Sequence, residues 1–245
     1  MKRTLFFFWS LLCMTTINAQ VADTLNVLCI GNSFTFFSDS PQKLVEVARS
    51  QGHEIIMTAI YEGGYTFNDH LHDMKSVRAV ERTGFDCVFL QDQSQMHARY
   101  AADTLRFLLA KCDTKELVDR VRMYSPEARI WLESTWSYSQ GNYGGFGSFE
   151  TFEALLIEGT SLLAASCQTM VSPIGKAFTK ARQERPDINL YYPDDKHQSD
   201  YGTYLKVCVN YLLIYGKPFR GQVATCGMDP EKCAYLQKVA EQIVL

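Results

Sequence analysis

Five short apolar segments alternate with longer segments of helical periodicity along this chain of 245 residues. Apolar runs this short, bounded by Gly, Pro or polar residues, are typical of strands that are buried on both faces. Expected strands lie at residues 26–30, 54–60, 86–90 and 128–132, with a fifth within 166–174, and expected helices lie at 41–50, 67–82, 104–124, 149–165 and about 200–215. The alternation predicts an α/β fold, a three-layer α/β/α sandwich around a mostly parallel five-stranded sheet.

The first three expected strands each lead into residues that are able to do chemistry. Ser33 follows the first strand, Gly64 the second, and Gln91–Gln95 the third. In a parallel sheet the carboxyl ends of the strands meet at one edge, where α/β folds bind their ligands. We therefore expect these segments to share one site, with the Gly- and aromatic-rich loop at 138–148 on its rim.

Ser33 is a candidate nucleophile in the Gly-Asn-Ser-Phe turn at residues 31–34. The glycine allows a sharp turn, and the N-terminus of a following helix would add positive potential beside the hydroxyl. The alternative is that Ser33 caps that helix. Ser38 and Ser40 lie nearer the expected helix start and are better cap candidates, which leaves Ser33 free for catalysis.

An acid and a base for such a nucleophile occur together far downstream, in Asp194-Asp195-Lys196-His197. A serine hydroxyl needs an imidazole to take its proton, and a carboxylate that orients this imidazole improves it as a base. Residues three apart share a face of a helical turn, so Asp194 is preferred over Asp195 as the partner of His197. The alternative is a solvated acidic loop. The other histidines are weaker candidates for the base: His53, His70, His72 and His97, the last of which could line the site.

Ester hydrolysis also requires hydrogen-bond donors for an oxyanion. Gly64, in the Gly63-Gly64 pair, can turn its backbone N–H towards the site, although an ordinary turn would look the same. The third expected strand ends in Gln-Asp-Gln-Ser-Gln at residues 91–95, where alternation puts the three glutamines on one face. An amide side chain there could donate to an oxyanion, or the strand end could simply face water.

With these residues the chain resembles the SGNH (GDSL-type) hydrolase superfamily, from Val27 to about Gly221. The closest likeness is to an exported bacterial branch of unknown function that carries Gly-Asn-Ser-Phe and Gln-x-Gln-Ser blocks. The resemblance implies a flavodoxin-like fold and no cofactor. It implies that Ser33 is the nucleophile, His197 the base and Asp194 its orienting acid. Backbone N–H groups of Ser33 and Gly64 would then line the oxyanion hole.

The third block departs from the superfamily pattern Gly-x-Asn-Asp, whose Asn completes the oxyanion hole. This chain has no such Asn at residues 91–94. The resemblance implies that Gln93 replaces it, with Gln91 or Gln95 as alternatives.

Residues 1–19 have the features of a secretory signal peptide, with a basic start, an apolar centre and Ala19 at a possible cleavage site. Residues 20–245 would then form a single SGNH-like domain in the periplasm or outside the cell. Cys13 raises the alternative of a lipoprotein, which the bulky Leu12 before it disfavours. Since no other run is long enough for a membrane helix, we expect no membrane span in the mature chain.

Charge and cysteine content narrow the possible partners. The net charge is −3 and the sequence shows no basic stripe, which argues against a nucleic-acid partner. There is no CxxC pair and no zinc-ligand spacing, so no metal site is expected. In an oxidising compartment Cys226 and Cys233, which bracket a polar loop, are expected to form a disulfide.

The leading interpretation is a serine esterase that cleaves carboxylic esters, such as O-acetyl groups on carbohydrates. Export and aromatic residues near the expected loops favour a sugar: Trp131, Trp136, Tyr138 and Tyr143. One alternative is a lipid or acyl-chain esterase that uses the same residues. The other is a catalytically silent glycan-binding domain, since the third block is atypical. The sequence leaves the oligomeric state open.

Overall fold

A parallel five-stranded sheet forms the centre of the computed structural model, which describes residues 24–140 and 145–245. The strands are β1 (Thr24–Gly31), β2 (Glu54–Tyr61), β3 (Cys87–Leu90), β4 (Arg129–Glu133) and β5 (Met170–Ser172). Their order is β2-β1-β3-β4-β5, and every neighbouring pair is parallel. The expected parallel sheet is confirmed, with each strand within a few residues of its expected position.

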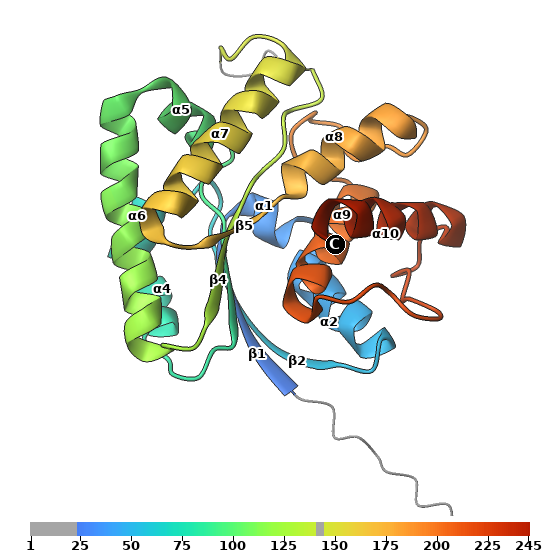
Figure 1. The fold of residues 1–245 in the computed structure, drawn as a ribbon, viewed down its shortest axis with the longest axis horizontal. Helices are drawn as coiled ribbons and strands as arrows, with labels where there is room; N and C mark the ends of the chain where they lie inside the picture. Colours follow the sequence, from blue (N-terminus) through green and yellow to red (C-terminus); the bar gives the residue numbers. More distant parts are fainter. Residues whose placement is uncertain (1–23, 141–144) are drawn as a thin grey trace, which may run out of the picture.

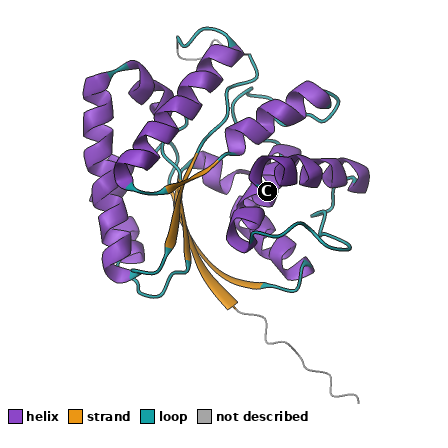
Figure 2. Ribbon diagram, viewed as in Figure 1, coloured by secondary structure: helices purple, strands orange, loops and turns teal. Residues whose placement is uncertain are grey.

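Helices cover both faces of this sheet (Figures 1 and 2). One layer holds α1 (Ser33–Phe36), α2 (Ser40–Ser50), α8 (Ile174–Glu184), α9 (Asp200–Tyr215) and α10 (Pro230–Val244). The other holds α3 (Phe67–His72), α4 (Met74–Val80), α5 (Met96–Ala102), α6 (Thr104–Tyr124) and α7 (Phe149–Cys167). A 3₁₀ turn, η1 (Phe37–Asp39), links α1 to α2. The three-layer α/β/α architecture is therefore confirmed.

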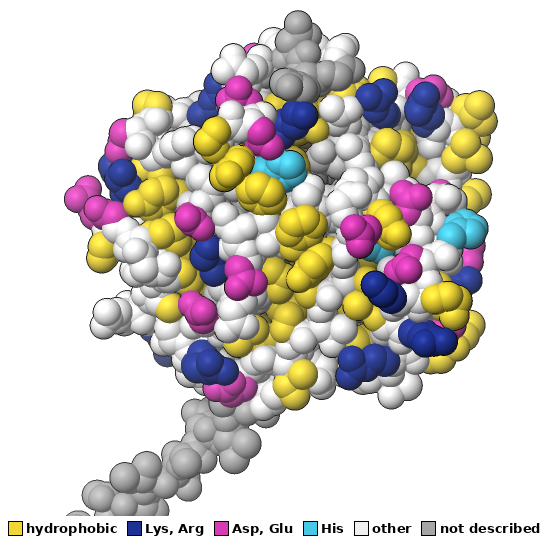
Figure 3. Space-filling model, turned by 180° about the vertical axis from the view of Figure 1, so that it is seen from behind, with side chains coloured by type: hydrophobic (Ala, Val, Ile, Leu, Met, Phe, Trp, Pro, Cys, Tyr) yellow, Lys and Arg dark blue, Asp and Glu magenta, His cyan; other side chains and the backbone are white. Residues whose placement is uncertain are grey.

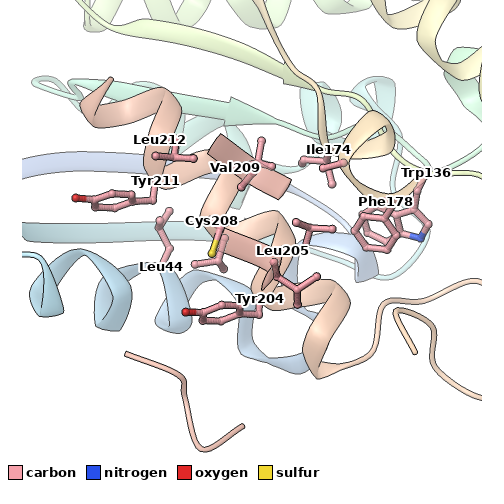
Figure 4. Packing of buried hydrophobic residues seen from close by; sticks show 14 of the residues in the cluster. Leu44, Trp136, Ile174, Phe178, Tyr204, Leu205, Cys208, Val209, Tyr211 and Leu212 are labelled. Carbon is pink, nitrogen blue, oxygen red and sulfur yellow. The ribbon is translucent and has the colours of Figure 1, made fainter. Parts of the chain in front are cut away.

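Helix α9 lies deepest in its layer. It packs against α2, α8 and α10. Figure 4 shows its side chains among apolar residues that include Leu44 of α2 and Phe178 of α8. Leu205 and Leu212 are fully buried, and burying one such side chain contributes about 1.5–3 kcal/mol. Because α9 begins just after His197, this packing fixes the position of the expected base.

The expected helix at residues 67–82 is broken in the structure. Asp73 is extended between α3 and α4, and its side chain accepts a hydrogen bond from the N–H of Ser76 as the cap of the second helix. The helix at 200–215 is not the last one, because α10 follows it. Asp229 caps α10 and Pro230 occupies its first turn, a start signal that the sequence contains.

The expected disulfide between Cys226 and Cys233 is wrong, since both residues are free thiols. Cys233 is buried on the first turn of α10, and its Sγ lies 3.9 Å from the carbonyl oxygen of Thr225. The thiol of Cys226 instead interacts with the carboxylate of Glu46 on α2. The two sulfur atoms therefore have different partners although the residues are close in sequence.

Two expectations fall on residues outside the described part of the chain: the signal peptide at 1–19 and Tyr143 in the loop after β4. Among the described residues, no helix has both the length and the apolar character needed to cross a bilayer. On the face shown in Figure 3, acidic and basic side chains are interspersed among apolar ones without a broad patch of one sign.

Candidate active site

Ser33 is the first residue of α1, at the carboxyl end of β1. Asn32 is the cap of this helix, since its Oδ1 accepts a hydrogen bond of 3.2 Å from the N–H of Phe34. The expectation that Ser38 or Ser40 caps the following helix is wrong. Ser40 is already helical, and Asp39 precedes it in a left-handed conformation without a side-chain cap bond. Ser33 nevertheless has no capping role, because Asn32 performs it.

The side chains of Ser33, His197 and Asp194 form a continuous hydrogen-bonded chain. The Oγ of Ser33 lies 2.8 Å from Nε2 of His197, although the two residues are 164 positions apart in sequence. On the other side of the ring, Nδ1 lies 2.5 Å from Oδ2 of Asp194. With the proton on Nδ1, this nitrogen donates to the carboxylate while Nε2 accepts from the serine hydroxyl. This is the tautomer that a general base requires.

Asp194 and His197 lie in a tight turn that is closed by an antiparallel bridge between Tyr191 and Gln198, not in a helical turn. The backbone N–H groups of Lys196 and His197 donate to Oδ1 of Asp194 at 3.1 and 3.0 Å. Burial raises the pKa of Asp194, but hydrogen bonds from the His197 ring and these two N–H groups outweigh it and lower the pKa overall. The carboxylate is therefore ionised at neutral pH.

Asp195, the alternative acid, has a different partner. Its Oδ1 accepts a hydrogen bond of 2.5 Å from the hydroxyl of Ser139, and its backbone carbonyl accepts one of 2.9 Å from the Ser139 N–H. These bonds tie the turn to the segment after β4. Asp195 thus supports the loop, and of these two carboxylates it is Asp194 that bonds the imidazole.

Two phenylalanines hold the imidazole of His197. Phe37 stacks on it with ring centroids 4.3 Å apart, and Phe34 meets its edge at 5.2 Å. Both belong to the short segment that begins with Ser33. The serine and the histidine are therefore positioned by the same few residues, in addition to their own hydrogen bond.

Hydrogen bonds from neighbouring strand ends fix the turn that carries Ser33. Asn32 donates through Nδ2 to the carbonyl of Tyr65 at 2.9 Å, which joins the turn to the segment after β2. The Oε1 of Gln91 accepts bonds from the Asn32 N–H at 3.0 Å and the Thr35 hydroxyl at 2.9 Å. At Gly31 a Cβ would lie 2.2 Å from Thr35 Oγ1, so only glycine fits this close approach.

Buried polar side chains hold the same turn from the core side. The carbonyl of Phe34 accepts hydrogen bonds of 3.0 Å from both Lys206 Nζ and Gln198 Nε2. Lys206 also pairs with Glu133 at 2.6 Å, and both side chains are only 3% exposed. The charge of the Lys206 ammonium is therefore balanced by the Glu133 carboxylate within the core, while the ammonium also anchors the helix that begins at Ser33.

The geometry differs among the expected oxyanion donors. Neither the Ser33 N–H nor the Gly64 N–H has an acceptor among the described residues, and Gly64 has a φ of 77° in an exposed turn. Gln93 is half-buried; its Oε1 accepts from the N–H of Gln95, and its Nε2 has no partner in the described part of the chain. Gln91 is the weaker candidate, because its side chain is fully buried and its Nε2 already donates to the Asp92 carbonyl.

The aromatic residues around the site are not those that the sequence suggested. Trp131, Trp136 and Tyr138 are 1–2% exposed and fill the core, so their expected role in sugar binding is wrong. A different aromatic row lies near Ser33, with half-buried Phe36 and Phe37 in its middle: Tyr61, Phe36, Phe37 and Tyr192, whose ring centroids are 5.0, 6.4 and 5.1 Å apart in that order. Tyr61 and Tyr192, at its two ends, are 44% and 49% exposed.

The described residues contain no cluster of His, Cys, Asp or Glu side chains that could hold a metal ion. A cavity of about 140 Å³ lies between α3, α5 and α6, but it is lined by residues such as Phe67, Met96 and Leu109 and by no member of the Ser33–His197–Asp194 chain. The chemistry-bearing side chains thus lie apart from this cavity.

Three solved structures resemble this one. A DUF4886 family protein from Bacteroides uniformis matches with a TM-score of 0.77 and 20% identity over 91% of this chain and 95% of its own. A candidate SGNH hydrolase from Slackia heliotrinireducens matches with a TM-score of 0.60 and 20% identity over 77% of this chain and 98% of its own. A variant of the acetyl xylan esterase Axe2 from Geobacillus stearothermophilus matches with a TM-score of 0.59 and 14% identity. The match covers 80% of this chain and 97% of the esterase.

The chain has the SGNH-hydrolase fold. At these identities the likeness establishes the fold, not the reaction. Comparison with protein-family models and with curated protein sequences finds no match. Within the SGNH fold, the residues described above lie at the carboxyl edge of the sheet, where Ser33 follows β1, Gly64 follows β2 and Gln93 follows β3.

Several residues that shape this site were not singled out from the sequence. Asn32 is part of the Gly-Asn-Ser-Phe turn, yet its bond to Tyr65 depends on the neighbouring strand. Gln198 directly follows His197, and its full burial and its bond to the Phe34 carbonyl come from the fold, so the sequence carried no signal for its role. Lys206 had no signal beyond a lone charge within an apolar helix.

Proposed function

We propose that this protein is a serine esterase in which Ser33 is the nucleophile, His197 the general base and Asp194 its orienting acid. The observation that carries the proposal is the hydrogen-bonded chain from Ser33 Oγ through His197 to Asp194, at 2.8 and 2.5 Å. Three side chains from two distant segments meet in the arrangement that acyl transfer needs. The SGNH fold, shared with acetyl xylan esterases, supports the same reaction class.

In the first half of the reaction Ser33 Oγ bonds to the ester carbonyl carbon while His197 Nε2 takes the hydroxyl proton. The ionised Asp194 stabilises the resulting imidazolium through Nδ1. The carbonyl oxygen becomes an oxyanion, which accepts hydrogen bonds from the N–H groups of Ser33 and Gly64 and from Gln93 Nε2. The carbonyl–alkoxy bond then breaks, and the leaving alcohol takes the proton from Nε2.

The second half of the reaction repeats these steps with water. Nε2 of His197 takes a proton from the water as its oxygen attacks the acyl carbon, and the same donors hold the oxyanion. The intermediate then releases the carboxylic acid, and Ser33 Oγ recovers its proton from the imidazolium. The ester, one water molecule and these side chains account for every atom in the cycle.

We propose esters of carbohydrates, such as O-acetyl sugars, as the substrate class. The aromatic row from Tyr61 to Tyr192 supports this choice, because aromatic faces with polar tips suit the alternating apolar and hydroxyl surfaces of a sugar ring. The sequence of residues 1–19, with its signal-peptide features, fits a substrate outside the cytoplasm.

The test is ester turnover by the purified mature protein and by Ser33→Ala. We expect hydrolysis of p-nitrophenyl acetate and of acetylated xylan, and a loss of roughly 10⁴-fold or more in the variant. Retention of most turnover in Ser33→Ala would reject the mechanism. Rates that increase with acyl length would favour an acyl-chain esterase, and glycan binding without turnover would favour a silent binding domain.

A further inference from the structure

Asp92 is a fully buried carboxylate at the carboxyl end of β3, next to Gln93. Its Oδ1 accepts hydrogen bonds from the N–H of Gln93 at 2.8 Å and from the N–H of Phe67 at 3.1 Å. Its Oδ2 accepts one from the hydroxyl of Tyr100 at 2.7 Å. All three donors come from different segments: the end of β3, the start of α3 and helix α5.

These contacts bear directly on the oxyanion hole. Phe67 begins α3 three residues after Gly64, in the segment that follows β2. Gln93 belongs to the segment that follows β3. A single carboxylate oxygen therefore bridges the two segments that carry the Gly64 N–H and the Gln93 amide, and Tyr100 holds the other oxygen in place.

We infer that Asp92 is a positioning residue for the oxyanion hole, which sets the separation of the Gly64 and Gln93 donors by bonding both segments through Oδ1. This inference rests on the proposed esterase function. Asp92 does not touch the substrate in this role. It acts through the backbone of Phe67 and Gln93, whose N–H groups are occupied by the carboxylate and do not serve the oxyanion themselves.

Asp92 lowers the stability of the folded protein, which agrees with a functional role for this residue. Burial raises its pKa to about 6, and the hydrogen bonds from Tyr100, Gln93 and Phe67 offset only part of that effect. The carboxylate of Asp113 on α6 raises the pKa further. An ionised Asp92 thus destabilises the folded protein at neutral pH, as strained or charged groups at functional sites often do.

Two substitutions separate positioning from mere structural support. Asp92→Ala removes every acceptor and should release both segments. Asp92→Asn keeps Oδ1, which can still accept from Phe67 and Gln93, and removes the charge. Asp69→Ala is the matched control, because Asp69 bonds Thr66 in the capping box at the start of α3, beside Phe67, without a hydrogen bond to Asp92.

The experiment measures kcat and KM for p-nitrophenyl acetate, together with hydrogen–deuterium exchange, on the full mature chain. We expect Asp92→Ala to lower kcat by about 10–100-fold with little change in KM, since donors used in the transition state are misplaced. Its Phe67 and Gln93 amides should exchange faster while those of α9 do not. Asp92→Asn should recover kcat to within about tenfold of the wild type, with unchanged thermal stability or a higher one above pH 6.

The outcomes distinguish this inference from the proposed function. An inactive wild type, or an active Ser33→Ala, would reject the esterase and the inference with it. An active wild type whose folded Asp92→Ala variant keeps its kcat would overturn the inference alone. So would an Asp69→Ala variant with the same loss of kcat, or an Asp92→Asn variant as impaired as Asp92→Ala.

Discussion

Phe37 stacks on the imidazole of His197, with ring centroids 4.3 Å apart and planes 16° from parallel. Phe37 follows directly after the helix that begins with Ser33, so the stack joins the segment of the nucleophile to that of the base. An aromatic pair of this kind contributes about 1 kcal/mol. The imidazole is therefore restrained by its ring face as well as by its two nitrogen atoms.

Replacing Phe37 with alanine should loosen the imidazole. We expect Phe37→Ala to lower kcat for a small acetyl ester about fivefold, the equivalent of one aromatic pair. Phe36→Ala is the matched control, because Phe36 lies against Tyr61 and not on His197. Steady-state kinetics of both variants checks this, and equal effects in the two would contradict it.

Gln93 is predicted to donate to the oxyanion through Nε2. Gln93→Ala should lower kcat by ~10²–10³ with little change in KM, the effect of losing one transition-state donor. Gln95→Ala should do less, since its Oε1 is engaged by Arg99. Gln91→Ala should mainly reduce stability, because two hydrogen bonds end on its Oε1. An unaltered kcat in Gln93→Ala would assign the hole to backbone N–H groups alone.

The buried pair of Lys206 and Glu133 should be costly to break from one side. Lys206→Met leaves a carboxylate without its cation in the core, for which we expect a loss of about 3–5 kcal/mol in the free energy of unfolding. The double variant Lys206→Met with Glu133→Gln should recover part of this loss, since no buried charge remains. Urea denaturation measures both, and a single variant as stable as the wild type would contradict the prediction.

His97 should make the protein sensitive to acid. Burial lowers its pKa from 6.5 to about 4, and it lies beneath α7 with Nδ1 2.8 Å from Thr160 Oγ1. The stability that depends on neutral His97 is complete above pH 6.5 and is lost as pH falls towards 4, by about 3 kcal/mol at most. Asp92 acts in the opposite direction, since its pKa is raised to about 6.

The two effects are separable by substitution. Thermal unfolding of His97→Gln between pH 7 and pH 4 should show a smaller decrease in Tm than that of the wild type, because glutamine can bond Thr160 without titrating. Parallel Tm curves for the two proteins would show that His97 does not contribute to the acid sensitivity.

Thiol reactivity tests the absence of the disulfide. Cys112 is the exposed cysteine among the described residues, while Cys226 is half-buried and Cys233 is buried. A thiol reagent should therefore modify Cys112 first in the native protein, and Cys112→Ser should abolish the fast phase. All seven cysteines of the described chain should react after denaturation without a reductant. If Cys226 and Cys233 failed to react after denaturation, the expected disulfide between them would be present after all.

Local sequence was enough to predict the sheet and the pairing within the Asp-x-x-His turn. The strands are apolar because both of their faces are covered, and such runs are visible without knowing what covers them. Asp194 and His197 are three residues apart, so a single turn brings them together whatever the rest of the chain does. The position of Ser33 at a strand end followed from the same pattern.

Only the tertiary structure decided how side chains from distant segments meet. Gln91 and Gln93 look equivalent in the sequence, yet the Oε1 of Gln91 accepts hydrogen bonds from Asn32 and Thr35, which follow another strand. Trp136 is buried because α8 supplies Phe178, whose ring stacks on it at 4.2 Å. Spacing along the chain reports contacts within one or two turns, whereas the environment of a side chain depends on partners that the fold brings in from elsewhere.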